Sequence, residues 1–145
     1  MKLSTKSRYG LRAILEITKK TSSGHSAKRK EISESQTISE SYLENILLIL
    51  KNSHLIKATR GKNGGYILAR PASTITLKDI ITALEGPLSL VECIDTPSIC
   101  EKTTACISRT IWKELTDSWY GILEGITLQG LIDREASGFS SPFCI

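Results

Sequence analysis

Three cysteines lie close together in the segment CIDTPSICEKTTAC, residues 93–106. Cys93, Cys100 and Cys106 are separated by six and five residues, and the chain has one other cysteine, Cys144. Four cysteines in 145 residues are too few for a fold held by disulfides. Clustered thiolates instead bind iron–sulfur clusters or zinc, or exchange between thiol and disulfide. The segment has no large apolar residue except isoleucine, so we expect its order to depend on such a ligand.

The first half of the chain predicts three helices and a β-hairpin. Apolar residues at helical spacing indicate two buried faces, formed by Leu11, Ile14, Leu15 and Thr18 and by Leu43, Ile46, Leu47 and Leu50. Residues 28–36 fit a short helix between them, and Ser39 is a plausible N-cap for the third helix. Aliphatic runs at 55–59 and 65–69 flank the glycine-rich turn RGKNGG and predict two strands.

Two helices joined by a short turn and followed by a basic hairpin describe a winged helix-turn-helix. The second helix of such a unit can enter the major groove with its first residues facing base edges. Arg60 and Lys62 at the hairpin tip can follow phosphates or reach the minor groove, and the glycines allow close backbone approach. The expected fold is mainly α with a small β-hairpin wing: a winged helix-turn-helix plus a long dimerisation helix.

The charge is distributed unevenly along the chain. Residues 1–70 contain 14 Lys and Arg against 5 Asp and Glu, whereas residues 71–145 contain 5 against 10. This pattern favours double-stranded DNA as the partner of the basic half over a merely solvated basic surface or a protein-binding winged helix. No signal peptide and no apolar run of membrane-spanning length is visible, so we expect a soluble cytoplasmic protein without a membrane partner.

Two further helices are expected in the second half. Thr76 and Asp79 resemble a capping box at the start of a helix that ends at Gly86-Pro87. After the cysteines, apolar residues recur with spacings of three, four, three and four, at Trp112, Leu115, Trp119, Ile122 and Ile126. This a/d pattern suits a helix packed on its own domain, but the winged helix is already complete, so we expect a homodimer interface. A two-fold dimer would place two reading helices on a palindromic operator.

Three stretches of the chain resemble one family. They are the opening MKLSTKSRYGLRAILEI, the segment ISESQTISESYLENILLILKNSHLIKATRGKNGGYILARP, and ITLKDIITALEGPLSLVEC. They are similar to the bacterial iron–sulfur-cluster regulators of the IscR type and their relatives NsrR and CymR, over roughly residues 1–125. The resemblance implies a dimeric winged-helix repressor or activator. Its expected parts are a DNA-binding domain (1–86), a cysteine loop (87–107), a dimerisation helix region (108–135) and a flexible tail (136–145).

The resemblance also implies roles for individual residues. The start of the recognition helix, SESYLE, would place Ser39, Ser41, Tyr42 and Glu44 near DNA, with Glu44 as a candidate reader of cytosine. Arg60 would be the minor-groove arginine, and Lys2, Lys28 and Arg29 would be backbone contacts. Cys93, Cys100 and Cys106 would hold an iron–sulfur cluster, with 2Fe–2S favoured over 4Fe–4S, a choice that the spacing itself does not make.

The fourth cluster ligand departs from the family. Arg109 stands where IscR has a histidine, and Arg8 stands where the nitric-oxide branch takes an aspartate. Arginine stays protonated and cannot ligate iron. The remaining candidates are Glu92, Asp95, Glu101, Cys144, or an exogenous water or small thiol. A weak fourth ligand would expose one iron to small molecules, which suits a sensor.

Other functions remain as alternatives. One is a cluster-free thiol/disulfide switch, or a repressor controlled by a partner protein as in CymR-type relatives, although those lack this cysteine trio. A structural zinc site would need a good fourth ligand. We expect no enzyme, because no Cys–His pair with an orienting acid is visible and RGKNGG lacks the P-loop pattern. His25 and His54 belong to no evident site.

Overall fold

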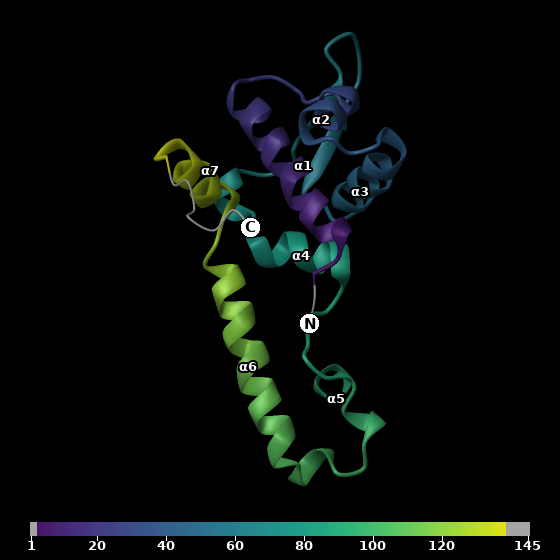
Figure 1. The fold of residues 1–145 in the computed structure, drawn as a ribbon, viewed down its shortest axis with the longest axis vertical. Helices are drawn as coiled ribbons and strands as arrows, with labels where there is room; N and C mark the ends of the chain where they lie inside the picture. The colour runs from purple at the N-terminus through teal and green to yellow at the C-terminus, as the bar shows by residue number, and fades with distance from the viewer. Residues whose placement is uncertain (1–2, 139–145) are drawn as a thin grey trace.

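The computed structural model describes residues 3–138 as a helical head from which a long arm projects (Figure 1). The head contains α1 (Thr5–Ser22), α2 (Arg29–Gln36), α3 (Glu40–Asn52), the hairpin β1 (Ile56–Thr59) and β2 (Gly65–Leu68), the 3-10 turn η1 (Ala72–Thr74), α4 (Leu77–Glu85) and α7 (Leu128–Ala136). The arm consists of α5 (Glu92–Asp95), the turns η2 (Pro97–Ile99) and η3 (Thr103–Ala105), and α6 (Ile107–Glu124). The mainly helical winged helix-turn-helix fold is therefore confirmed. None of the helices within 3–138 is long and apolar enough to cross a membrane.

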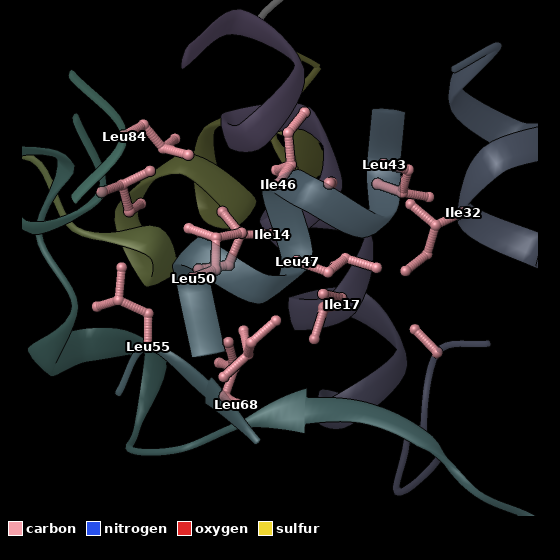
Figure 2. Packing of buried hydrophobic residues seen from close by; sticks show 14 of the residues in the cluster. Ile14, Ile17, Ile32, Leu43, Ile46, Leu47, Leu50, Leu55, Leu68 and Leu84 are labelled. Atoms are coloured by element: carbon pink, nitrogen blue, oxygen red, sulfur yellow. The ribbon is translucent and has the colours of Figure 1, made fainter. Parts of the chain in front are cut away.

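The core of the head lies where α1, α3 and α4 meet the hairpin. The predicted face of α3 is confirmed, since Leu43, Ile46, Leu47 and Leu50 are fully buried. In Figure 2, these side chains lie among Ile14 and Ile17 of α1, Leu55, Leu68 of β2 and Leu84 of α4. Burying these aliphatic side chains contributes about 1.5–3 kcal/mol each.

The buried face of α1 differs from the prediction. Ile14 and Thr18 are buried as expected, but Leu11 and Leu15 are half-buried. The face is centred instead on small residues, including the buried Ser7 and Gly10. The α-carbon of Gly10 lies so close to the Leu84 side chain that a methyl group there would overlap it. Small residues therefore let α1 and α4 approach closely, and a search for apolar periodicity alone does not detect them.

The wing is a two-stranded antiparallel hairpin that is anchored to the head. Ile56 pairs with Leu68, and Thr59 pairs with Gly65. Tyr66 also exchanges two backbone hydrogen bonds with Ala27, which precedes α2 (2.8 and 2.9 Å). The segment between α1 and α2 thus pairs with β2 as a short third strand would, and fixes the base of the hairpin.

The predicted capping box of α4 is present. The Thr76 hydroxyl accepts from the Asp79 N–H (3.1 Å), and the Asp79 carboxylate accepts from the Thr76 N–H (3.0 Å). Thr76 also forms a β-bridge with Thr127, the N-cap of α7. Across this bridge, the Leu77 N–H donates to the Ile126 carbonyl (2.7 Å). The start of α4 and the link between α6 and α7 are therefore held together.

Two predicted elements in the arm have a different local structure. The cysteine segment, expected to be a loop, contains the short helix α5 and two 3-10 turns. The helix expected through Ile126 ends at Glu124, with Gly125 as its C-cap. Two residues later the Thr127 hydroxyl accepts from the Gly130 N–H (3.1 Å) and caps the start of α7. Ile126 consequently lies in the link between the two helices rather than on α6.

Candidate nucleic-acid interface and cysteine segment

The start of α3 presents polar side chains to solvent while the rest of the helix packs on the core. Ser39 is the N-cap in extended backbone conformation, and Ser39, Ser41 and Glu44 are exposed. The Ser39 side chain makes no capping hydrogen bond, so its hydroxyl is available to another partner. Exposed hydroxyls and a carboxylate at a helix start are suited to hydrogen bonding with phosphates and base edges.

Tyr42 is held partly against α1. Its side chain is 36 % exposed, and its ring meets that of Tyr9 edge to face, with 6.1 Å between centroids. The Arg12 guanidinium lies 5.5 Å from the Tyr9 centroid, and its Nε donates to the Gln36 side chain (3.0 Å). The ring of Tyr42 therefore presents part of its surface outward from a fixed position.

Arg29 contacts both glutamates at the start of α3. Its Nε lies 3.1 Å from Glu40 Oε2, and its Nη1 lies 2.9 Å from Glu44 Oε2. Arg29, expected to contact the DNA backbone, is thus paired with Glu44, the expected base reader. Lys28, also expected at the backbone, is exposed, whereas Lys2 lies outside the described residues.

The tip of the wing exposes Arg60 and Lys62, as the sequence predicts. The hairpin needs glycine at three places: Gly61 has a φ of 102°, a methyl group on Gly64 would lie 2.7 Å from the Thr59 carbonyl oxygen, and one on Gly65 would lie 2.7 Å from the Ala27 carbonyl oxygen. These constraints hold the two cations at the end of a narrow hairpin. A basic hairpin of this shape can reach along a phosphate backbone.

The sequence analysis missed three side chains that lie around Arg60. A hollow between the end of α3 and the wing is lined by Lys51, His54, Lys57 and Arg60. Lys57 is exposed on β1, next to the buried Ile56. The alternation of apolar and polar residues in the strand could have identified Lys57. Lys51 lies in the last turn of α3, and the turn that follows the helix brings His54 there.

The three cysteines of the arm are free thiols on short elements. Cys93 in α5 and Cys106 before α6 are half-buried, and Cys100 is exposed. Within residues 3–138, no three Cys, His, Asp or Glu side chains converge on a position where they could hold a metal ion. The donor types fit a thiolate-bound cluster, but the described conformation does not gather them. Binding would require this part of the arm to close around the group.

Arg109 and Arg8, which stand where the resemblance implied a fourth cluster ligand, have other partners. Arg109 donates from Nε to the Cys93 carbonyl (3.0 Å) and ties α6 to the first cysteine, a role that no sequence signal reveals. Arg8 donates to the Thr5 hydroxyl (3.1 Å). Among the other candidates, the Asp95 carboxylate accepts from Ser89 (2.7 Å) and Glu92 and Glu101 are exposed, whereas Cys144 lies outside the described residues.

One side of α6 carries an exposed apolar stripe. Its members are Ile107, Ile111, Leu115 and Ile122, which are 74, 50, 48 and 60 % exposed, with Trp112 beside them at 41 %. The adjoining side packs on the head, where Leu123 is buried with Ile81 and Leu88, and Trp119 is half-buried against them. Of the five predicted interface residues, Trp112, Leu115 and Ile122 face solvent, Trp119 packs within its own chain, and Ile126 follows the helix.

Glu85 joins the start of α1 to the end of α4, immediately before the arm. Its Oε1 accepts from the Ser4 hydroxyl (2.5 Å), the Ser7 hydroxyl (2.5 Å) and the Ser4 N–H (3.0 Å). The hydrogen bonds from Ser4 and Ser7 lower the pKa of the Glu85 carboxyl. Since Ser7 is buried, this carboxylate supplies the partner that its hydroxyl needs.

Comparisons with known proteins agree with this geometry. The sequence profile of the Rrf2 family, described as an iron-dependent transcriptional regulator, matches residues 3–134. The chain is 39 % identical over 137 residues to protein rrf2 of Nitratidesulfovibrio vulgaris, covering 94 % of this chain and 90 % of that protein. The structure of CymR, the global cysteine regulator of B. subtilis, superposes with a TM-score of 0.72 at 36 % identity, covering 90 % of this chain and 95 % of that one. IscR of T. potens gives a TM-score of 0.77 at 30 % identity, with coverages of 97 % and 93 %.

Proposed function

Because the chain belongs to the Rrf2 family of transcriptional regulators, we propose that it binds double-stranded DNA as a two-fold dimer on a palindromic operator. Its α3 would lie in the major groove, and its wing would lie along the adjacent backbone or minor groove. The observation that carries this proposal is the exposed polar start of α3 beside a basic wing. The contacting residues would be Lys2, Lys28, Ser39, Ser41, Tyr42, Glu44, Arg60 and Lys62, with Arg29 next to them.

Dimerisation is supported by the apolar stripe of α6. Monomeric proteins rarely expose contiguous apolar patches of this kind. The helix stands away from the head, so a second copy can reach the stripe without contacting α3 (Figure 1). We propose Trp112, Leu115 and Ile122, with Ile107 and Ile111, as the interface, and Trp119 and Ile126 as residues that fix α6 to its own head.

We further propose that Cys93, Cys100 and Cys106 hold an iron–sulfur cluster, 2Fe–2S in preference to 4Fe–4S. The donor types support this, and IscR-type relatives share the family. The cluster would supply a group whose state changes with oxidants or small molecules. The thiols would lose protons on binding, and the segment from α5 to η3 would rearrange to bring them together. Arg109 would carry that change to α6 through the Cys93 carbonyl.

Two measurements test these proposals. Selection from a randomised duplex library should enrich a palindrome that the chain binds with salt-dependent affinity, and absence of any enriched sequence would contradict the DNA proposal. Anaerobically purified or reconstituted protein should show visible charge-transfer bands with matched iron and sulfide, lost in Cys100→Ser and kept in the control Ser98→Ala, which changes an exposed residue of the same segment. A colourless, iron-free protein after anaerobic reconstitution would remove the cluster proposal.

A second candidate is a thiol switch on the same fold. It is supported by the three free thiols, of which that of Cys100 is exposed to oxidants. In this case, oxidation would form a disulfide between two of the three and change DNA affinity without bound iron. Mass spectrometry of the iron-free protein after mild oxidation would identify that pair.

A further inference from the structure

The guanidinium of Arg29 is shared between two carboxylates on one face of the recognition helix. It approaches Oε2 of Glu40 at 3.1 Å and Oε2 of Glu44 at 2.9 Å. Glu40 and Glu44 are four residues apart, so their side chains lie one above the other on α3. The three side chains are about half exposed, at 40, 47 and 63 %, and all reach the surface at the start of α3.

This arrangement reduces the electrostatic repulsion that the start of α3 would otherwise have near DNA. Like charges at this spacing repel each other, and phosphates would repel both glutamates further. An arginine presents its N–H groups as a rigid fork and can engage two acceptors at once. Arg29 offsets the repulsion and restricts the orientation of the Glu44 side chain before any DNA arrives.

The contact also leaves part of the Glu44 carboxylate available. Arg29 engages Oε2 of Glu44, and a carboxylate has a second oxygen with its own lone pairs. That oxygen, Oε1, can accept a hydrogen bond from the N4 amino group of cytosine. The charge of Arg29 is meanwhile directed at the glutamates rather than at a phosphate.

We propose that Arg29 is a positioning residue that holds Glu44 for base recognition, and so determines sequence discrimination rather than general DNA affinity. This inference rests on the proposed function, in which α3 enters the major groove. It replaces the simpler expectation that Arg29 is a backbone contact. The two roles give different results when the residue is removed. Loss of a phosphate contact weakens binding to all sequences equally, whereas loss of a positioning residue changes the ratio of affinities between sequences.

The test uses the full chain and the duplex selected by the wild type, together with every single-base-pair variant of that duplex. Dissociation constants are measured by fluorescence anisotropy at one fixed salt concentration. The proteins are the wild type, Arg29→Ala, Arg29→Lys, Glu44→Ala and the Arg29→Ala/Glu44→Ala double variant. The matched control is Lys28→Ala, which removes the neighbouring exposed cation.

Glu44→Ala should lose about tenfold or more of the discrimination at one base pair, as expected for a direct base contact. Arg29→Ala should lose at least about threefold at the same base pair, and the double variant should discriminate no worse than Glu44→Ala alone. Arg29→Lys keeps the charge but not the fork, and should recover part of the loss. Lys28→Ala should weaken all duplexes alike.

Three results would overturn the proposal. Arg29→Ala could lower affinity uniformly with unchanged discrimination, its effect could add to that of Glu44→Ala, or Glu44→Ala itself could leave discrimination intact. Failure of the wild type to select any duplex would instead sink the proposed function, and this inference with it. Thermal unfolding of each variant, which should differ little because the ion pairs are exposed, separates loss of recognition from loss of fold.

Discussion

Replacing Glu85 by glutamine tests whether one carboxylate at the end of α4 stabilises the fold through its charge. Its Oε1 accepts three hydrogen bonds, from the hydroxyl and N–H of Ser4 and the hydroxyl of Ser7. Glutamine keeps a carbonyl acceptor, and a hydrogen bond to a charged acceptor contributes roughly 1 kcal/mol more than one to a neutral acceptor. Three such bonds set an upper bound of about 3 kcal/mol. Because Glu85 is only half-buried, solvent screening lowers the expected loss of unfolding free energy to about 1–2 kcal/mol.

The effect should depend on pH in a defined direction. Hydrogen bonds from Ser4 and then Ser7 lower the pKa of Glu85 below the ordinary value of 4.5. A carboxyl whose pKa is lower in the folded state stabilises the fold fully above its unfolded-state pKa, and loses that contribution as pH falls through its folded-state pKa. The difference between wild type and Glu85→Gln should therefore be full at pH 7 and shrink as pH falls below 4.5.

Urea unfolding at a series of pH values from neutral to acid measures this difference. The matched control is Glu135→Gln, which removes an exposed carboxylate paired with Lys19 (2.7 Å) and should cost less than about 1 kcal/mol. A Glu85→Gln effect no larger than that of the control would refute the argument. So would a difference that stays constant from neutral to acid pH.

Three further predictions concern the wing and the arm. Gly65→Ala should cost about 1–3 kcal/mol of unfolding free energy because its methyl group would meet the Ala27 carbonyl; Gly121→Ala, where a methyl group meets nothing in this chain, should instead be neutral or stabilising in the same urea titration. Leu115→Lys places a charge in the exposed stripe of α6 and should shift sedimentation from dimer to monomer, while an unchanged dimer would place the interface elsewhere. Arg109→Ala removes a hydrogen bond worth about 1 kcal/mol and should speed alkylation of Cys93 roughly fivefold, with no change expected at the exposed Cys100.

The sequence predicted the elements whose chemistry repeats along the chain. The aliphatic face of α3 and the glycine-rich hairpin have clear periods, and both were located correctly. The capping box of α4 was also predicted, because Thr76 and Asp79 stand three residues apart. In each case the residues that the local backbone geometry requires lie close together in the sequence, so a short pattern identifies them.

The remaining features depend on contacts between distant segments. The close packing of α1 on α4 is made by Ser7 and Gly10, which no apolar pattern includes. The pairing of Arg29 with Glu44 joins two helices, so their separate positions in the sequence do not reveal it. The cysteine segment alternates between short helices and turns, which are too brief to produce a period.

The two ends of the arm are both attached to α4. The arm leaves after Glu85 at the end of this helix, and returns where the Ile126 carbonyl accepts from Leu77 at its start. The return is reinforced by an ion pair between Lys78 and Glu124, and α7 then packs on α1. A single proteolytic cut within the cysteine segment would consequently leave the C-terminal fragment, with α6 and α7, bound to the rest of the head. Nicked protein would separate into two bands under denaturing conditions, yet sediment as one particle.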